Sequence, residues 1–308
     1  MPTALLIIAR AVHIGTSILI AGTLTFEVVA LRSVSLPASD DPRRIEEHLA
    51  RLIVWSLVAA LLSGVLWFWL VVAEMTGLSP ANALSAKAWQ IVLLQTNFGH
   101  VWELRLALIA LAFVLIAPSP PEDKLQRALM LTLWLLSVVV LVSLAWISHA
   151  AAAGIQPLGL LGDALQLSAA GVWIGGLAPL VIFITRARQS FSLGREVAPV
   201  LKRFSTLSLC CVSVLVVSGI CNSWLLVGSI HALFTTPYGW LLLCKLILFG
   251  ILVGFGARNR FAIKTKMPRA HEYLLPQLRR NVICEACLGA ALVAIVACLG
   301  VTPPAQHP

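Results

Sequence analysis

Stretches of about 20 consecutive apolar residues recur along the whole chain, and each is long enough to cross a hydrocarbon layer about 30 Å thick. Inside a bilayer every backbone N–H and C=O group must bond within the protein, and a helix achieves this within a single segment. The sequence therefore predicts an all-α fold, a polytopic membrane protein with eight transmembrane helices. The expected spans are residues 4–31, 52–73, 99–117, 128–148, 163–185, 205–228, 238–257 and 281–301.

The composition excludes a soluble domain with a single membrane anchor, because 59% of the 308 residues are apolar and only 11% are charged. The net charge of +9 would suggest nucleic acid binding in a soluble protein. Here the Lys and Arg residues gather in alternate loops, around residues 32–51, 124–127, 186–203 and 258–280. The positive-inside rule places these loops in the cytoplasm and both termini outside. The lipid bilayer is the expected surrounding, and nucleic acid is not an expected partner.

The second half of the chain repeats the pattern of the first half in the same orientation. Thr96 to Leu106 aligns without gaps with Thr236 to Leu246, so that Arg105 corresponds to Lys245. Further pairs are His13 with Gln166, Gly22 with Gly175, Ser63-Gly64 with Ser218-Gly219, and Trp69 with Trp224. We therefore expect a single transmembrane domain over residues 1–308 that contains a parallel 4+4 repeat, with four helices in 1–150 and four in 151–308.

Three histidines lie near the same end of three different spans of the first half. His13 lies about two turns into the first span, His100 begins the third, and His149 ends the fourth. Neutral imidazole is the commonest metal ligand in proteins and suits copper. Glu103 lies one turn beyond His100 on the same helix face. The sequence thus predicts a metal site formed by His13, His100, His149 and Glu103. The alternative is that interfacial histidines bond only to lipid headgroups or backbone.

Ionisable side chains within the spans suggest a path for a cation, because charged groups are costly in a membrane and are usually functional. Thiols within the spans are further possible ligands on such a path. The candidates are Glu27, Lys245, Cys284 and Cys287. Each has a structural alternative. Glu27 is placed to form a salt bridge with Arg32, and the two cysteines are equally consistent with small apolar packing residues. Two further expectations are that Glu285 pairs with Arg279 or Arg280 and that His48, in a short charged helix, is solvated.

The chain resembles the CopD copper-resistance family over nearly its whole length. The resemblance rests on the order and spacing of short motifs: Ser148-His149-Ala150-Ala151, Trp173-Ile174-Gly175-Gly176-Leu177, Arg203-Phe204-Ser205, Ser218-Gly219-Ile220-Cys221-Asn222, Tyr238-Gly239 with Lys245, Asn259-Arg260 and Val301-Thr302-Pro303-Pro304. It implies a protein of the bacterial inner membrane that handles copper together with a periplasmic CopC-type copper-binding partner. The chain departs from the family pattern at Gln166, where histidine is expected, and this favours the first-half histidines.

The leading interpretation is therefore copper transport, with copper ion captured by the histidines on the periplasmic side and passed through the helix bundle. We expect no enzyme activity, because no phosphate-binding loop or nucleophile elbow is present. The alternative is an electron-transfer protein with b-type haem, since histidines on two helices of a four-helix unit can ligate haem iron. Copper docking without transport is a third possibility.

Overall fold

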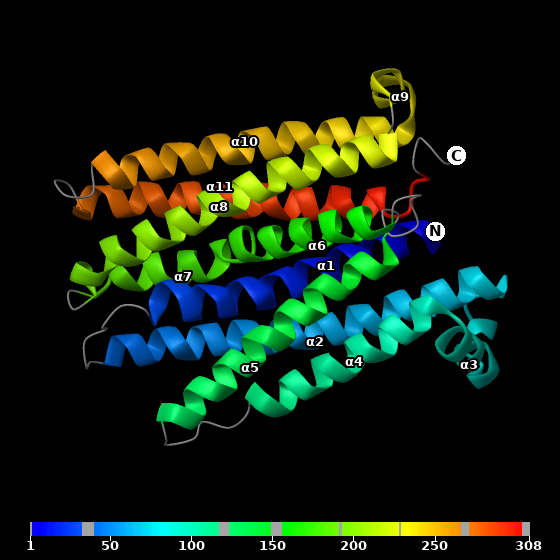
Figure 1. Ribbon diagram of the computed structural model, residues 1–308. Helices are drawn as coiled ribbons and strands as arrows, with labels where there is room; N and C mark the ends of the chain where they lie inside the picture. Colours follow the sequence, from blue (N-terminus) through cyan, green and yellow to red (C-terminus); the bar gives the residue numbers. More distant parts are fainter. Residues whose placement is uncertain are drawn as a thin grey trace.

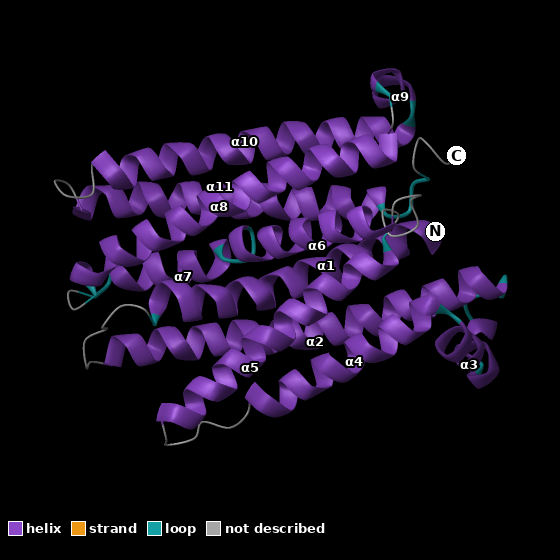
Figure 2. Ribbon diagram, viewed as in Figure 1, coloured by secondary structure: helices purple, strands orange, loops and turns teal. Residues whose placement is uncertain are grey.

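The computed structural model describes residues 2–32, 40–116, 123–148, 156–190, 193–227, 229–265 and 271–303. Within these ranges every regular element is a helix and no strand is present (Figure 2). The long elements are α1 (Pro2–Thr25), α2 (Asp40–Thr76), α4 (Asn97–Ile116), α5 (Asp123–Val142), α6 (Gln156–Trp173), α7 (Leu177–Ala187), α8 (Gly194–Val227), α10 (Pro237–Thr265) and α11 (His271–Leu299). The short elements are the π-helical η1 (Phe26–Leu31), the 3₁₀ segments η2 (Asn82–Leu84) and η3 (Ser143–Ile147), α3 (Ala86–Gln95) and α9 (Ile230–Thr235).

Eight helical segments in the described part of the chain are long and apolar enough to cross a membrane, which confirms the predicted fold class. α1 with η1, α5 with η3, and α6 with α7 each form one span. The fifth span has a break at 174–176 between α6 and α7, where two consecutive glycines follow Ile174. Predicted and observed spans coincide in number and order and differ mainly at their ends, where several helices continue past the apolar stretch.

The eight spans form one bundle with α1 at its centre (Figure 1). α1 packs against α2 and α5 of the first half and against α6, α7 and α11 of the second. α4 and α10 lie on opposite outer sides of the bundle. α1 begins and α11 ends at the same end, which also carries α3 and α9 and is called the terminal end below. The helix ends that flank the predicted basic loops lie at the other end, called the loop end.

The closest approach in the centre of the bundle is between α1 and the break after α6. A Cβ atom on Gly175 would collide with the backbone carbonyl of Ile18, and one on Gly22 would collide with the backbone of Gly175 and Gly171. Small residues permit such backbone contact between membrane helices. Gly22 and Gly175 are an aligned pair of the predicted repeat, and contact between equivalent residues is the arrangement expected at a pseudo-two-fold axis.

The corners before α4 and α10 have the same local structure. Thr96 accepts a hydrogen bond from the Gly99 amide at 2.9 Å and donates to the Val92 carbonyl at 2.7 Å. Thr236 accepts from the Gly239 amide at 3.0 Å and donates to the Ala232 carbonyl at 2.7 Å. Both glycines lie against the backbone of the preceding short helix, where a side chain would not fit. These matched corners support the repeat, which stays a prediction for the halves as a whole.

Candidate functional site: a buried histidine–arginine pair and a neighbouring cavity

His13 lies inside the first half of the bundle, with no exposed surface. Its Nδ1 lies 2.9 Å from the carbonyl oxygen of Ala60 on α2, and its Nε2 lies 2.7 Å from Nη2 of Arg105 on α4. A carbonyl only accepts and a guanidinium only donates, so Nδ1 carries the proton and Nε2 accepts. His13 is therefore a neutral imidazole whose two nitrogens both have partners.

Arg105 is also fully buried, and no carboxylate among the described residues forms an ion pair with it. Its guanidinium donates to the Val140 carbonyl and, at 2.6 Å, to Ser143 Oγ, as well as to His13. These acceptors lie where α5 changes to the 3₁₀ geometry of η3. A buried cation without a counterion is costly in a membrane protein, so its presence marks this core as a candidate functional site.

Aromatic side chains enclose the pair. The His13 ring lies 5.6 Å from the Trp67 ring and 5.2 Å from the Trp102 ring, centre to centre. The Arg105 guanidinium lies 5.6 Å from the centre of the Trp102 ring, in the range of a cation–π contact. Trp102 donates to the carbonyl of Gly64, and Gly64 leaves only enough room for the His13 imidazole. The enclosure excludes water and strengthens the electrostatic interactions inside it.

The predicted metal ligands occupy different surroundings. His100 and Glu103 are exposed on α4, whereas Gly99, Trp102 and Arg105 form its buried face. His149 lies outside the described residues. Among the described residues, no three His, Cys, Asp or Glu side chains are grouped so that they could hold a metal ion. A site that includes His149 is not tested by this arrangement and stays a prediction.

The predicted path residues are also separated. Glu27 forms the expected salt bridge with Arg32, at 3.3 Å. Cys284 and Cys287 are exposed on α11. The prediction that Glu285 pairs with Arg279 or Arg280 is wrong, since no ion pair among the described residues joins it to either. The Asn259 amide donates to the Glu285 carboxylate, and Arg279 donates instead to Thr185. These side chains therefore do not form one continuous path among the described residues.

Lys245 borders a cavity of about 700 Å³ in the terminal half of the bundle. α1, α6, α8, α10 and α11 provide most of its wall, which is largely apolar. Asn222 donates to the Asp163 carboxylate, and Asp163 also interacts electrostatically with Lys245. Arg10 and Trp67 of the first half also line this cavity.

The predicted repeat aligns residues of the cavity wall with the buried pair of the first half. In the predicted repeat Lys245 corresponds to Arg105, and Gln166 to His13. Gly219 packs near the Gln166 amide as Gly64 packs on His13. The same alignment pairs Trp67 with Asn222 and Trp102 with Leu242. Replacing two indole rings by smaller side chains leaves space, which accounts for a packed core in one half and a cavity in the other.

Comparison with known families matches both halves of the chain. The model for "Copper resistance protein D-like, N-terminal domain" matches residues 1–158, and the model for "Copper resistance protein D" matches residues 198–299. The chain belongs to the copper resistance protein D family. The first match contains His13 and Arg105, and the second contains Asn222 and Lys245, whereas Asp163 lies between the two matched ranges.

Three curated proteins are similar in sequence to this chain. Inner membrane protein YebZ of Escherichia coli is 28% identical over 85% of this chain and 84% of its own length. Copper resistance protein D of Pseudomonas syringae is 28% identical over 70% and 71%. Copper transport protein CutJ of Bacillus subtilis is 27% identical over 70% of this chain, which covers 39% of CutJ. No solved structure matches this chain.

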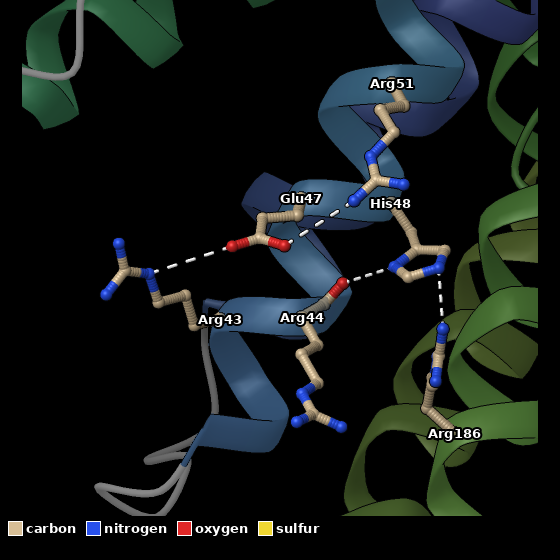
Figure 3. Close-up of polar contacts among 6 residues, drawn as sticks. All are labelled: Arg43, Arg44, Glu47, His48, Arg51 and Arg186. Atoms are coloured by element: carbon tan, nitrogen blue, oxygen red, sulfur yellow. Dashed lines mark hydrogen bonds and ion pairs between the residues drawn. The ribbon is translucent and has the colours of Figure 1, made fainter.

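A second histidine–arginine contact lies at the loop end of this copper resistance protein D family member. His48 on α2 is half-buried, and its Nε2 lies 2.6 Å from Nη2 of Arg186 on α7 (Figure 3). Its Nδ1 lies 2.6 Å from the carbonyl oxygen of Arg44. His48 is therefore only partly solvated, because α7 packs against this part of α2.

His48→Ala is expected to lower the free energy of unfolding by about 1 kcal/mol, the usual contribution of such hydrogen bonds. The Arg43–Glu47 and Glu47–Arg51 ion pairs beside it are exposed, and Glu47→Gln is the matched control with an effect below about 0.5 kcal/mol. Thermal unfolding of the variants in detergent measures both. An equal loss from the two substitutions would contradict the role of the His48–Arg186 contact.

Proposed function

We propose that this protein transports copper across the bacterial inner membrane and so contributes to copper resistance. Membership of the copper resistance protein D family supports the choice of copper, and the names of the relatives, copper transport protein CutJ and inner membrane protein YebZ, support transport and location. The observation in the fold that carries the proposal is the buried His13–Arg105 pair, because an apolar bundle keeps such costly groups only for function.

In this proposal the terminal end faces the periplasm. The basic loops then lie in the cytoplasm, as the positive-inside rule requires. Copper arrives from a periplasmic CopC-type protein and meets His100 and Glu103, which are exposed on α4 near this end, together with His149. These groups supply the nitrogen and oxygen ligands that copper accepts.

His13 is the next ligand inward, and Arg105 controls its availability. In the resting arrangement Arg105 occupies Nε2 of His13, the only ring nitrogen with a lone pair available to a metal. Copper binds there after the guanidinium leaves Nε2, and Arg105 keeps its bonds to Val140 and Ser143. Arg105 thus holds the position of a cation until copper replaces it, which prevents an empty, hydrated pathway through the core.

His149→Ala and His13→Ala are each expected to lower the copper that copurifies with the protein at least about tenfold, since each removes a ligand of the proposed path. Elemental analysis of detergent-purified protein from copper-grown cells measures this. His231→Ala is the control, because His231 is exposed on α9 at the same end and is outside the proposed site. Unchanged copper in both site variants would contradict the ligand set. Stoichiometric iron with a haem spectrum would instead favour electron transfer.

A further inference from the structure

The cavity beside Lys245 is bordered by exposed apolar side chains. Trp224 is 76% exposed, Ile220 67% and Leu246 46%, and all three line the cavity from α8 and α10. In a transmembrane helix such surfaces face the acyl chains of the bilayer. The cavity is therefore accessible from the membrane rather than enclosed, and an apolar chain can enter it between these helices.

The charges on the cavity wall are not balanced. Its charged residues are Arg10, Lys245 and Asp163, two cations and one acid. Asp163 interacts with Lys245 and Asn222. The Arg10 guanidinium stacks 4.5 Å from the centre of the Trp67 ring, and its buried Nε has no hydrogen-bond partner. The exposed Glu74 exerts only a longer-range attraction on it. A buried donor without a partner is costly, so an anionic group here would be stabilised.

Arg10 lies at the depth of lipid headgroups. The first span, Thr3–Leu31, has 29 residues and is roughly 43 Å long at 1.5 Å per residue, against about 30 Å of hydrocarbon. If it is centred, roughly 7 Å extends beyond the hydrocarbon at each end. Arg10 is seven residues from Thr3, so its Cα lies only roughly 4 Å below that boundary. A long guanidinium side chain covers this distance.

We propose that the cavity binds one anionic phospholipid, with its phosphate on Arg10 and an acyl chain along the apolar wall. The planar guanidinium pairs with phosphate oxygens through parallel N–H bonds. Asn222 and Leu242, in place of the two tryptophans of the first half, provide the space. Two side chains connect the lipid phosphate to the buried pair, because Arg10 stacks on Trp67 and Trp67 contacts His13. The site goes beyond copper transport and does not depend on it.

Native mass spectrometry of the full-length protein after mild delipidation tests the site, with phosphatidylglycerol in the detergent as the probe. The wild type is expected to retain one phosphatidylglycerol. Arg10→Gln removes the charge and Leu242→Trp fills the cavity as Trp102 fills the first half, and each is expected to reduce the bound fraction at least tenfold. Ile247→Trp is the matched control, because Ile247 is 62% exposed on α10 outside the cavity.

Phosphatidylglycerol is also expected to raise the melting temperature of the wild type and of Ile247→Trp, but not of Arg10→Gln, since a ligand stabilises only the state that binds it. If the Leu242→Trp variant does not fold, the Arg10→Gln variant alone still tests whether the phospholipid binds at this site. Retention that is equal in Arg10→Gln and the wild type would overturn the proposal, because it would indicate lipid bound around the helices. A free fatty acid or a quinone recovered in place of phospholipid would also overturn it.

Discussion

Gly175→Leu is expected to prevent the recovery of folded protein, or to lower its melting temperature more than any other single change considered. A side chain at this position would enter the space of the Ile18 carbonyl on α1. Overpacking usually costs about 1–3 kcal/mol, but here the opposing atoms are backbone and no side chain can move aside. The two central helices must separate, and every contact between the halves is weakened. Size-exclusion chromatography of heated, detergent-solubilised protein measures the loss.

Gly250→Leu is the matched control, since a side chain at Gly250 meets no atom within 4 Å. Its effect on folding is expected to be small, because both substitutions replace a glycine by leucine and only the one at Gly175 creates a collision. Gly175 and Gly250 variants of equal stability would show that α1 and the α6–α7 break are not in close contact.

Arg105→Leu is expected to reduce the free energy of unfolding by about 3–5 kcal/mol, the range for breaking a buried charged network by removing one partner. The substitution leaves His13 Nε2, the Val140 carbonyl and Ser143 Oγ without their shared donor. Arg105→Lys restores the charge but not the forked geometry, so an intermediate loss is expected. Thermal and denaturant unfolding in detergent measures the order of the three proteins.

Lys87→Leu is the control for Arg105→Leu, because Lys87 is exposed near the terminal end and its removal changes the net charge by the same amount. A surface change of this kind is expected to stay within about 0.5 kcal/mol. If Arg105→Leu is as stable as Lys87→Leu, the guanidinium is not held by the three acceptors. A gain in copper binding by a folded Arg105→Lys variant would support displacement of Arg105 by copper.

The number, order and type of the membrane-spanning helices were predictable because each helix is encoded by its own apolar stretch. An apolar stretch of about 20 residues dictates a helix that satisfies its own backbone. The glycines at 22 and 175 were also recognisable, as an aligned small pair in adjacent repeats. The Glu27–Arg32 bridge followed from a five-residue separation on one helix. Each of these inferences depends on local sequence or on a direct comparison of the halves.

The partners of the polar residues were not predictable, because they depend on helix rotation. His13 and Glu103 lie near the same end of neighbouring spans, yet one faces the core and the other is exposed. The residue that meets His13 is Arg105, two positions beyond Glu103 and on the other side of α4. A histidine that aligns with glutamine, opposite an arginine that aligns with lysine, was the signal available for this pair.

An eight-helix membrane protein of a copper-resistance family could be recognised from the amino-acid sequence, because hydrophobic length and motif order are properties of the chain alone. The packing of the helices established that His13 is bound to Arg105, that Glu285 is bound to Asn259, and that a cavity lies beside Lys245. Contacts between helices depend on which face each helix presents and on how closely the backbones approach. Those quantities are fixed only when all the helices pack together.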